Sequence, residues 1–154
     1  GQLLTEKSLT FATAESCTGG LIGHMLTQVS GSSYYFKEGF VVYSNEAKVS
    51  RLGVEQQMLD EHGAVSEPVA RLMAEGVRRV AGADIGVSVT GISGPTGGSD
   101  KKPVGLTYIA VSDSTGTWCG KYIYTHDRIK NKERTAQTAL NLVRLRLLGL
   151  LEEA

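Results

Sequence analysis

Hydrophobic residues along the chain follow two patterns, one typical of buried strands and one typical of amphipathic helices. Short apolar runs predict strands over residues 9–14, 85–90 and 104–111, and residues 40–43 are expected to form a further, fully buried strand. A turn at residues 113–116 leads into another apolar run at 118–124, which indicates a hairpin late in the chain.

Helical spacing covers much of the remaining sequence. A helix is expected to start at Thr18 or Gly19, with Leu21, Ile22, Met25, Leu26 and Val29 on one face. Ser66 is a good N-cap, and Pro68 suits the first turn of the helix that follows it. Further helices are predicted up to Lys7, over residues 45–52 and 56–62, and from about Asn131 to Leu151.

Strands that alternate with helices, followed by one hairpin, predict the fold class. We expect an α/β protein, a three-layer α/β/α sandwich with a mixed, mostly parallel sheet and a late β-hairpin. The 154 residues fit one hydrophobic core, so residues 1–154 are predicted to form a single domain. The chain begins with Gly1 rather than Met, which is compatible with a piece cut from a longer polypeptide.

Composition narrows the possible functions. Sixteen basic and 16 acidic residues give no net charge, and without a basic run no nucleic-acid partner is expected. Cys17 and Cys119 form no C-x-x-C pair, which argues against a zinc site and a disulfide framework. The apolar stretches are too short for a membrane span and no signal peptide opens the chain, so a cytoplasmic location is expected.

Ser16 is the first candidate for chemistry. It lies between a predicted strand and a predicted helix, where ligands gather in open α/β sheets. Its hydroxyl could serve as a nucleophile, while the glycines at 19 and 20 allow a ligand close to the backbone. Backbone N–H groups near Thr18–Gly20 could then stabilise an oxyanion. On spacing alone, a helix cap and a plain turn explain these residues at least as well.

A serine nucleophile needs a base, and the sequence offers either a histidine or a lysine for this role. The three histidines are isolated and no Gly-x-Ser-x-Gly elbow is present, so a Ser-His-Asp hydrolase has no support. Lys48 could act if burial lowers its pKa, with Tyr43 orienting the amine or relaying a proton. Taken one at a time, a solvated helix lysine and a strand-end tyrosine are the simpler interpretations.

Two further segments suggest ligand contacts. Residues 90–98 follow a buried strand and contain four glycines and a proline, a pattern that favours a backbone surface shaped around a ligand, although a plain connector fits too. Arg128 stands at the start of the last helix, where an anion would offset an unfavourable dipole interaction. A surface pair with Asp127 is the commoner explanation.

Taken together, several motifs resemble the C-terminal domain of the competence/damage-inducible CinA family, which includes nicotinamide mononucleotide deamidases. The resemblance covers essentially the whole chain. The motifs that carry it are residues 14–20 (AESCTGG), 31–33 (GSS), 43–48 (YSNEAK), 62–66 (HGAVS), 90–95 (TGISGP) and 102–105 (KPVG).

This resemblance implies an amidohydrolase that converts nicotinamide mononucleotide to nicotinic acid mononucleotide and ammonia, without metal or cofactor. It implies a catalytic Ser–Lys pair, matched by Ser16 and Lys48, with Tyr43 assisting. Two positions depart from the family: Ser93 stands where Ala is frequent, and Lys132 replaces a second arginine, without its bidentate fork. The residues expected to bind substrate are Cys17, Thr18, Gly19, Gly20, Thr90, Gly91, Gly94 and Arg128.

Three alternatives remain at this stage. The chain could be a pyridine-nucleotide sensor without turnover, a competence or DNA-repair accessory, or an amidase for a different carboxamide. We expect a small-molecule nucleotide as the partner. The long last helix and the sheet edges further favour a homo-oligomer.

Overall fold

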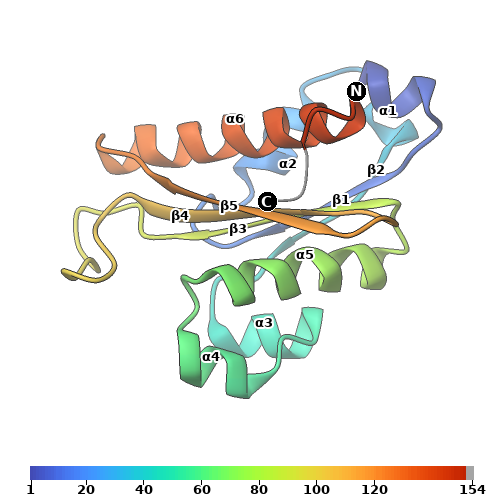
Figure 1. Cartoon of the computed structure of the whole chain (residues 1–154). Helices are drawn as coiled ribbons and strands as arrows, with labels where there is room; N and C mark the ends of the chain where they lie inside the picture. Colours follow the sequence, from blue (N-terminus) through green and yellow to red (C-terminus); the bar gives the residue numbers. More distant parts are fainter. Residues whose placement is uncertain (152–154) are drawn as a thin grey trace.

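The computed structural model describes residues 1–151 and contains one five-stranded sheet between two layers of helices. Figure 1 shows the three layers, with α1, α2 and α6 on one face and α3, α4 and α5 on the other. The helices are α1 (Gln2–Glu6), α2 (Leu21–Thr27), α3 (Asn45–Leu52), α4 (Gln56–His62), α5 (Glu67–Ala81) and α6 (Arg128–Leu147), with a 3-10 turn η1 (Ser32–Tyr34). The predicted three-layer α/β/α class is confirmed.

The sheet has the strand order β2-β1-β3-β4-β5. Its strands are β1 (Phe11–Glu15), β2 (Phe36–Val41), β3 (Ile85–Gly91), β4 (Leu106–Ser112) and β5 (Thr117–Ile123). β1 pairs in parallel with β2 and β3, whereas β4 pairs antiparallel with both of its neighbours. Only β4 therefore runs against the other strands, and the predicted mixed sheet with a late hairpin is confirmed.

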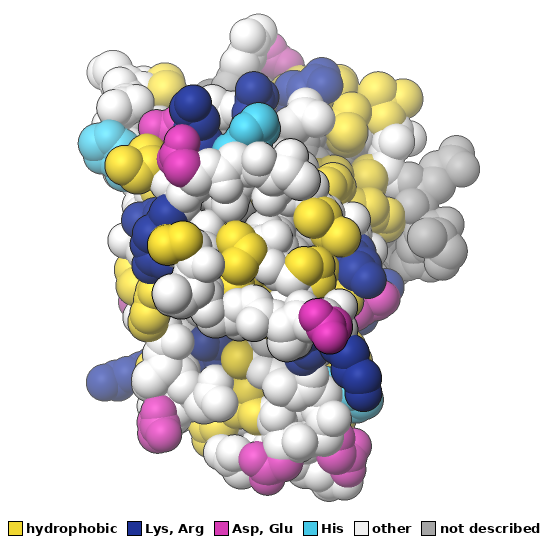
Figure 2. Space-filling view, turned by 90° about the vertical axis from the view of Figure 1, so that its left-hand side faces the viewer, with side chains coloured by type: hydrophobic (Ala, Val, Ile, Leu, Met, Phe, Trp, Pro, Cys, Tyr) yellow, Lys and Arg dark blue, Asp and Glu magenta, His cyan; other side chains and the backbone are white. Residues whose placement is uncertain are grey.

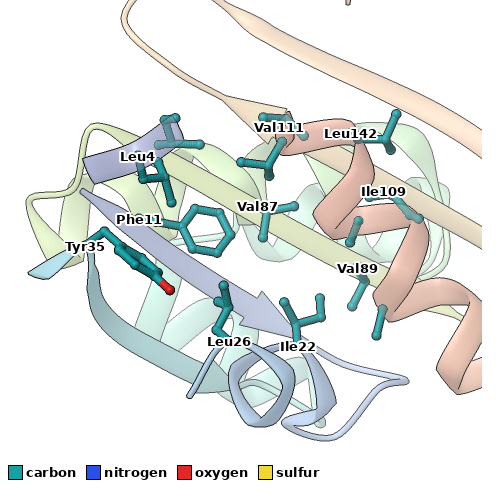
Figure 3. Close-up of a cluster of buried hydrophobic side chains, with 14 of the residues drawn as sticks. Leu4, Phe11, Ile22, Leu26, Tyr35, Val87, Val89, Ile109, Val111 and Leu142 are labelled. Atoms are coloured by element: carbon teal, nitrogen blue, oxygen red, sulfur yellow. The ribbon is translucent and has the colours of Figure 1, made fainter. Parts of the chain in front are cut away.

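The larger core cluster lies between the sheet and the layer of α1, α2 and α6. Alternate residues of the strands point into it, among them Phe11, Val87 and Ile109, and Ile22 and Leu142 reach it from the helices (Figure 3). On the opposite face, small residues let α5 lie close to the strands. A Cβ on Gly86 would stand 2.3 Å from the carbonyl oxygen of Ala74, so glycine is required there.

One predicted strand was wrong in position and burial. The strand expected at residues 40–43 runs instead over Phe36–Val41, and most of its residues are exposed or half-buried. It lies at the edge of the sheet and pairs only with β1, so its outer side has no neighbour. Val42 is buried just beyond the strand, while Tyr43 is 60% exposed. The apolar run therefore marks the exit from an edge strand rather than a central strand.

Two helices begin or end at positions that differ from the predictions. α2 starts at Leu21, because Gly19 and Gly20 have φ of 62° and 102°, outside the right-handed helical region. α6 starts at Arg128 rather than near Asn131, because the Asp127 side chain caps it by accepting a hydrogen bond from the Lys130 amide at 3.0 Å.

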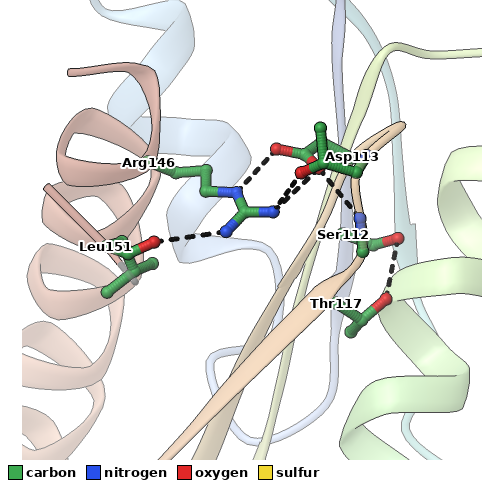
Figure 4. A network of polar contacts seen from close by, with 7 residues as sticks. Ser112, Asp113, Thr117, Arg146 and Leu151 are labelled. Atoms are coloured by element: carbon green, nitrogen blue, oxygen red, sulfur yellow. Dashed lines mark hydrogen bonds and ion pairs between the residues drawn. The ribbon is translucent and has the colours of Figure 1, made fainter. Parts of the chain in front are cut away.

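An ion pair joins the end of α6 to the turn between β4 and β5. The Arg146 guanidinium donates to both carboxylate oxygens of Asp113, at 2.6 and 3.0 Å, and to the Thr115 hydroxyl at 2.6 Å (Figure 4). A further bond reaches the carbonyl of Leu151 at 3.2 Å. These bonds hold the Asp113 pKa well below its usual range, because they favour the charged carboxylate.

Candidate active site

The predicted site residues lie at one end of the molecule, at the carboxyl ends of the parallel strands. Ser16 directly follows the central strand β1, and the chain after β2 leads into α3, which carries Lys48. The 92–105 loop follows β3, and α6 begins beside it (Figure 1). In Figure 2, which faces this end, basic and hydrophobic side chains lie close together, while several acidic side chains gather at the lower edge.

Lys48 and Ser16 are in contact. The Nζ atom of Lys48 lies 3.3 Å from the Oγ atom of Ser16. Two main-chain carbonyls fix the same amine, those of Val42 at 2.8 Å and Tyr43 at 3.2 Å. The structure therefore brings together the serine and the lysine that the sequence analysis paired.

The local fold explains how this lysine reaches the serine. β2 pairs in parallel with β1, with Val41 opposite Glu15, so the segments after both strands leave the sheet side by side. Ser44 then caps α3 by accepting a hydrogen bond from the Ala47 amide at 3.1 Å. The next residue, Lys48, is thereby directed back under the end of β1.

Burial favours the neutral form of Lys48, which is the form that can act as a base. The residue is 1% exposed, and this desolvation lowers its pKa because the charged ammonium loses water. A charge interaction with Glu46 acts weakly in the opposite direction. Within residues 1–151 no carboxylate forms a salt bridge with Lys48, so its contacts are with neutral oxygens.

Tyr43 contributes to the site differently from the sequence prediction. Its main-chain carbonyl holds the Lys48 amine, whereas its exposed phenol hydroxyl accepts a hydrogen bond from Nη2 of Arg128 at 3.3 Å. The orienting contact thus comes from the backbone. Within residues 1–151, the hydroxyl is hydrogen-bonded to Arg128 and not to Ser16 or Lys48.

The turn after Ser16 is organised by Glu15, a residue that the sequence analysis did not single out. Its carboxylate accepts hydrogen bonds from the Thr18 hydroxyl at 2.6 Å and from the amides of Gly20, Ile22 and Gly23 at 2.9–3.1 Å. An acidic residue at the end of an otherwise uncharged strand, directly before Ser16, was the signal available in the sequence.

These contacts change the expected oxyanion site. The Gly20 amide donates to Glu15 and the Gly19 amide donates to the carbonyl of Ser16 at 3.1 Å, so neither is free for a substrate oxygen. Within residues 1–151, the amides of Cys17 and Thr18 donate no hydrogen bond to another residue. The expectation of donors throughout Thr18–Gly20 was therefore too broad.

The cysteine beside Ser16 is not a competing nucleophile. Burial raises the pKa of the Cys17 thiol to about 12, so the thiol stays protonated near neutral pH. Cys17 and Cys119 are both free thiols. Within the described part of the chain, no group of three His, Cys, Asp or Glu residues could hold a metal ion.

The 90–94 segment combines structural contacts with one contact to the candidate site. The Thr90 hydroxyl donates to the Ala64 carbonyl at 2.8 Å, which ties β3 to the segment between α4 and α5. A Cβ on Gly91 would lie 2.6 Å from the Thr107 hydroxyl oxygen, so this glycine is required for strand packing. The carbonyl of Gly94 accepts a hydrogen bond from Nη1 of Arg128 at 2.8 Å. Substrate contacts of these residues stay predictions.

The first two turns of α6 face both loops. Asn131, which is buried, donates from its side-chain amide to the Ser93 carbonyl at 3.0 Å. The Nζ atom of Lys132 lies 3.9 Å from the position that a Cβ on Gly19 would take, so this ammonium stands beside the Ser16 turn. A pocket of about 610 Å³ opens next to Arg128. Its other lining residues are Ser93, Pro95, Val104, His126, Asp127 and Ile129.

Fold and site together define an α/β domain in which the half-buried Ser16 contacts the buried Lys48 at the carboxyl end of the parallel strands. The sequence model of the CinA C-terminal domain matches residues 1–147, and the chain belongs to this family. No helix within residues 1–151 has the length and apolar character needed to cross a bilayer.

Relatives and solved structures agree with this assignment. The chain is 54% identical to a CinA-like protein of Syntrophus aciditrophicus, with 92% of this chain and 34% of that protein aligned. It is 50% identical to a putative competence-damage inducible protein of Symbiobacterium thermophilum, with 99% of this chain and 38% of that protein aligned. The chain thus spans about a third of the length of these curated relatives.

The crystal structure of a competence/damage inducible protein from Agrobacterium tumefaciens superposes with a TM-score of 0.90 at 42% identity, covering 94% of this chain and 88% of that one. A CinA superfamily protein from Klebsiella pneumoniae gives 0.93 at 30% identity, covering 96% and 92%.

Proposed function

We propose that this domain is a nicotinamide-nucleotide amidohydrolase that converts nicotinamide mononucleotide to nicotinic acid mononucleotide and ammonia. The observation that carries the proposal is the contact between Ser16 Oγ and the buried Lys48 Nζ at 3.3 Å. This contact supports amide hydrolysis through a serine nucleophile. The choice of a nicotinamide nucleotide rests on the resemblance of the motifs to the deamidases of the family.

The hydrogen-bond partners around Lys48 are compatible with a neutral amine. A neutral amine has two N–H donors and one lone pair, whereas the ammonium ion has three donors and no acceptor. The carbonyls of Val42 and Tyr43 would accept from the two N–H groups. The lone pair is then left for the proton of the Ser16 hydroxyl, and burial lowers the Lys48 pKa in the direction that favours this state.

The reaction then proceeds in two stages. Lys48 takes the proton as Ser16 Oγ attacks the carboxamide carbon, and the resulting tetrahedral intermediate carries its negative charge on the former carbonyl oxygen. The proton passes from Lys48 to the leaving nitrogen, the C–N bond breaks and ammonia departs. Water, deprotonated by Lys48, hydrolyses the ester on Ser16, and the proton returns to the serine oxygen.

The substrate's remaining parts would lie toward α6. Arg128 and Lys132 are two of the three cationic side chains in residues 128–132, and they lie beside the Gly94 carbonyl and the Ser16 turn respectively. The pocket beside Arg128 is large enough for part of a nucleotide. A phosphate monoester near these two side chains would suit their charge.

An ammonia-release assay tests this proposal. Nicotinamide mononucleotide, nicotinamide riboside and nicotinamide would be compared side by side, with Ser16→Ala and Lys48→Met as inactive variants. We expect release from the mononucleotide by the wild type and loss in both variants, with far-ultraviolet circular dichroism unchanged. Saturable binding without ammonia release would favour a sensor instead. Full activity in either variant would contradict the Ser–Lys mechanism.

A further inference from the structure

Glu15 is the most deeply buried carboxylate beside the candidate nucleophile. The residue is 2% exposed, and its two carboxylate oxygens accept four hydrogen bonds, all from residues 18–23. Within residues 1–151, no basic side chain forms a salt bridge with it. The charge is balanced by three backbone amides and one hydroxyl.

These hydrogen bonds span the whole turn that contains Ser16. Glu15 ends β1, while Ile22 and Gly23 already belong to α2, so one carboxylate connects the strand before the serine to the helix after it. The residue at the helix N-cap itself is Gly20, which has no side chain to accept these bonds. Glu15 therefore fixes both ends of the segment that presents the Ser16 hydroxyl.

The same contacts decide which amides stay available. Of the amides in residues 16–20, those of Ser16, Gly19 and Gly20 donate to the carbonyl of Val89, the carbonyl of Ser16 and the Glu15 carboxylate. The amides of Cys17 and Thr18 are the two that donate to no other residue within the described chain. A fixed donor that makes no hydrogen bond to another residue is available to stabilise an oxyanion.

We infer that Glu15 is a positioning residue, which holds Ser16 within reach of Lys48 and keeps the amides of Cys17 and Thr18 as the oxyanion donors. This inference rests on the proposed function only in taking Ser16 as the nucleophile. A carboxylate can accept from all four donors, whereas the amide of a glutamine offers one accepting oxygen and an N–H₂ group that would meet N–H donors. Glu15→Gln keeps the shape of the side chain and disturbs the turn.

Two measurements on Glu15→Gln and wild type test the inference. The first is the rate at which a fluorophosphonate labels Ser16, followed by intact mass and peptide mapping. In this reaction an Oγ–P bond forms, the P–F bond breaks, fluoride leaves and Lys48 takes the serine proton. The second is kcat and KM for ammonia release from nicotinamide mononucleotide.

For the folded Glu15→Gln variant we expect labelling and kcat to fall by about 10²-fold, the effect of a misplaced reacting group, with KM within about threefold of wild type. Glu15→Asp, which keeps the charge on a shorter side chain, should recover part of the labelling rate. The matched control is Asp113→Asn at the opposite end of the sheet, whose carboxylate also accepts several hydrogen bonds. It should lose stability and keep the wild-type labelling rate per folded molecule.

Wild-type labelling of folded Glu15→Gln would overturn the inference, and so would a wild type that fluorophosphonate does not label. If Glu15→Gln does not fold, Glu15→Asp decides, and a rate equal to that of wild type overturns the inference. Labelling without ammonia release from nicotinamide mononucleotide would count against the proposed substrate alone. The role of Glu15 is then judged from the labelling rates.

Discussion

Two ends of the same sheet each bury a basic side chain, in opposite ways. At the end opposite the candidate site, Arg146 meets the Asp113 carboxylate through two charge-assisted hydrogen bonds. At the site end, the hydrogen-bond partners of Lys48 within residues 1–151 are a serine hydroxyl and two carbonyls. The first arrangement stabilises both charges, whereas the second disfavours the charge on the lysine.

The difference shows how one fold separates structure from chemistry. A paired guanidinium keeps its proton at all relevant pH values, so Arg146 can join α6 to the β4–β5 turn but cannot act as a base. Burial lowers the pKa of the Lys48 amine, which favours the neutral form that can exchange a proton with its neighbour.

The largest expected effect is on catalysis at the site end. Lys48→Met should lower kcat by about 10³-fold or more, since it removes the proposed general base. Arg146→Met should leave kcat per folded molecule within about twofold of wild type, because Arg146 lies at the end of α6 and contacts the β4–β5 turn, away from the candidate site. Ammonia release, normalised to the folded fraction, measures both. Equal losses in the two variants would mean that Lys48 acts only through the fold.

The next effect is on stability, where the variant at Arg146 should be affected more than the variant at Lys48. Arg146→Met should lower the free energy of unfolding by about 2–3 kcal/mol, because it leaves Asp113 without its cation in a partly buried position. Lys48→Met should lower the free energy of unfolding less. It removes three hydrogen bonds, but it also removes the desolvation penalty of a buried amine. Urea denaturation at neutral pH compares them. A larger loss for Lys48→Met would contradict this order.

The pH dependence of stability should also differ between the ends. The lowered pKa of Lys48 means that, between its folded value and about 10.4, the unfolded chain binds more protons than the folded one. Wild type should therefore gain stability relative to Lys48→Met as pH rises through this window.

The lowered pKa of Asp113 has its effect in acid. Its stabilisation is complete above the unfolded value of about 3.9 and is lost as pH falls below it. Wild type should therefore lose its stability advantage over Asp113→Asn in this range. Urea denaturation measured from about pH 3 to about pH 10 would show both trends. A reversed pH dependence of stability at Lys48 or at Asp113 would contradict the pKa shift assigned to that residue.

The sequence predicted the fold class and the Ser16–Lys48 pairing, because strand–helix alternation is visible along the chain and places both residues after strands that can lie side by side. It placed β2 wrongly, since an apolar run does not distinguish a central strand from the exit of an edge strand. It missed Glu15 because the value of this residue lies in bonds to residues 18–23 that only the folded turn creates. The sequence pattern also could not show that Tyr43 contacts Lys48 through its main-chain carbonyl rather than through its side chain.

The smallest expected effect concerns Tyr43 and separates its backbone from its side chain. The carbonyl that holds Lys48 remains in Tyr43→Phe, and only the hydroxyl that accepts from Arg128 is lost. We expect kcat within about threefold of wild type and a modest rise in KM, because an exposed hydrogen bond at 3.3 Å contributes little. Steady-state kinetics would measure the split between kcat and KM. A fall in kcat of about 10²-fold would instead assign the hydroxyl to proton transfer, and the lysine would then share the chemistry with the tyrosine.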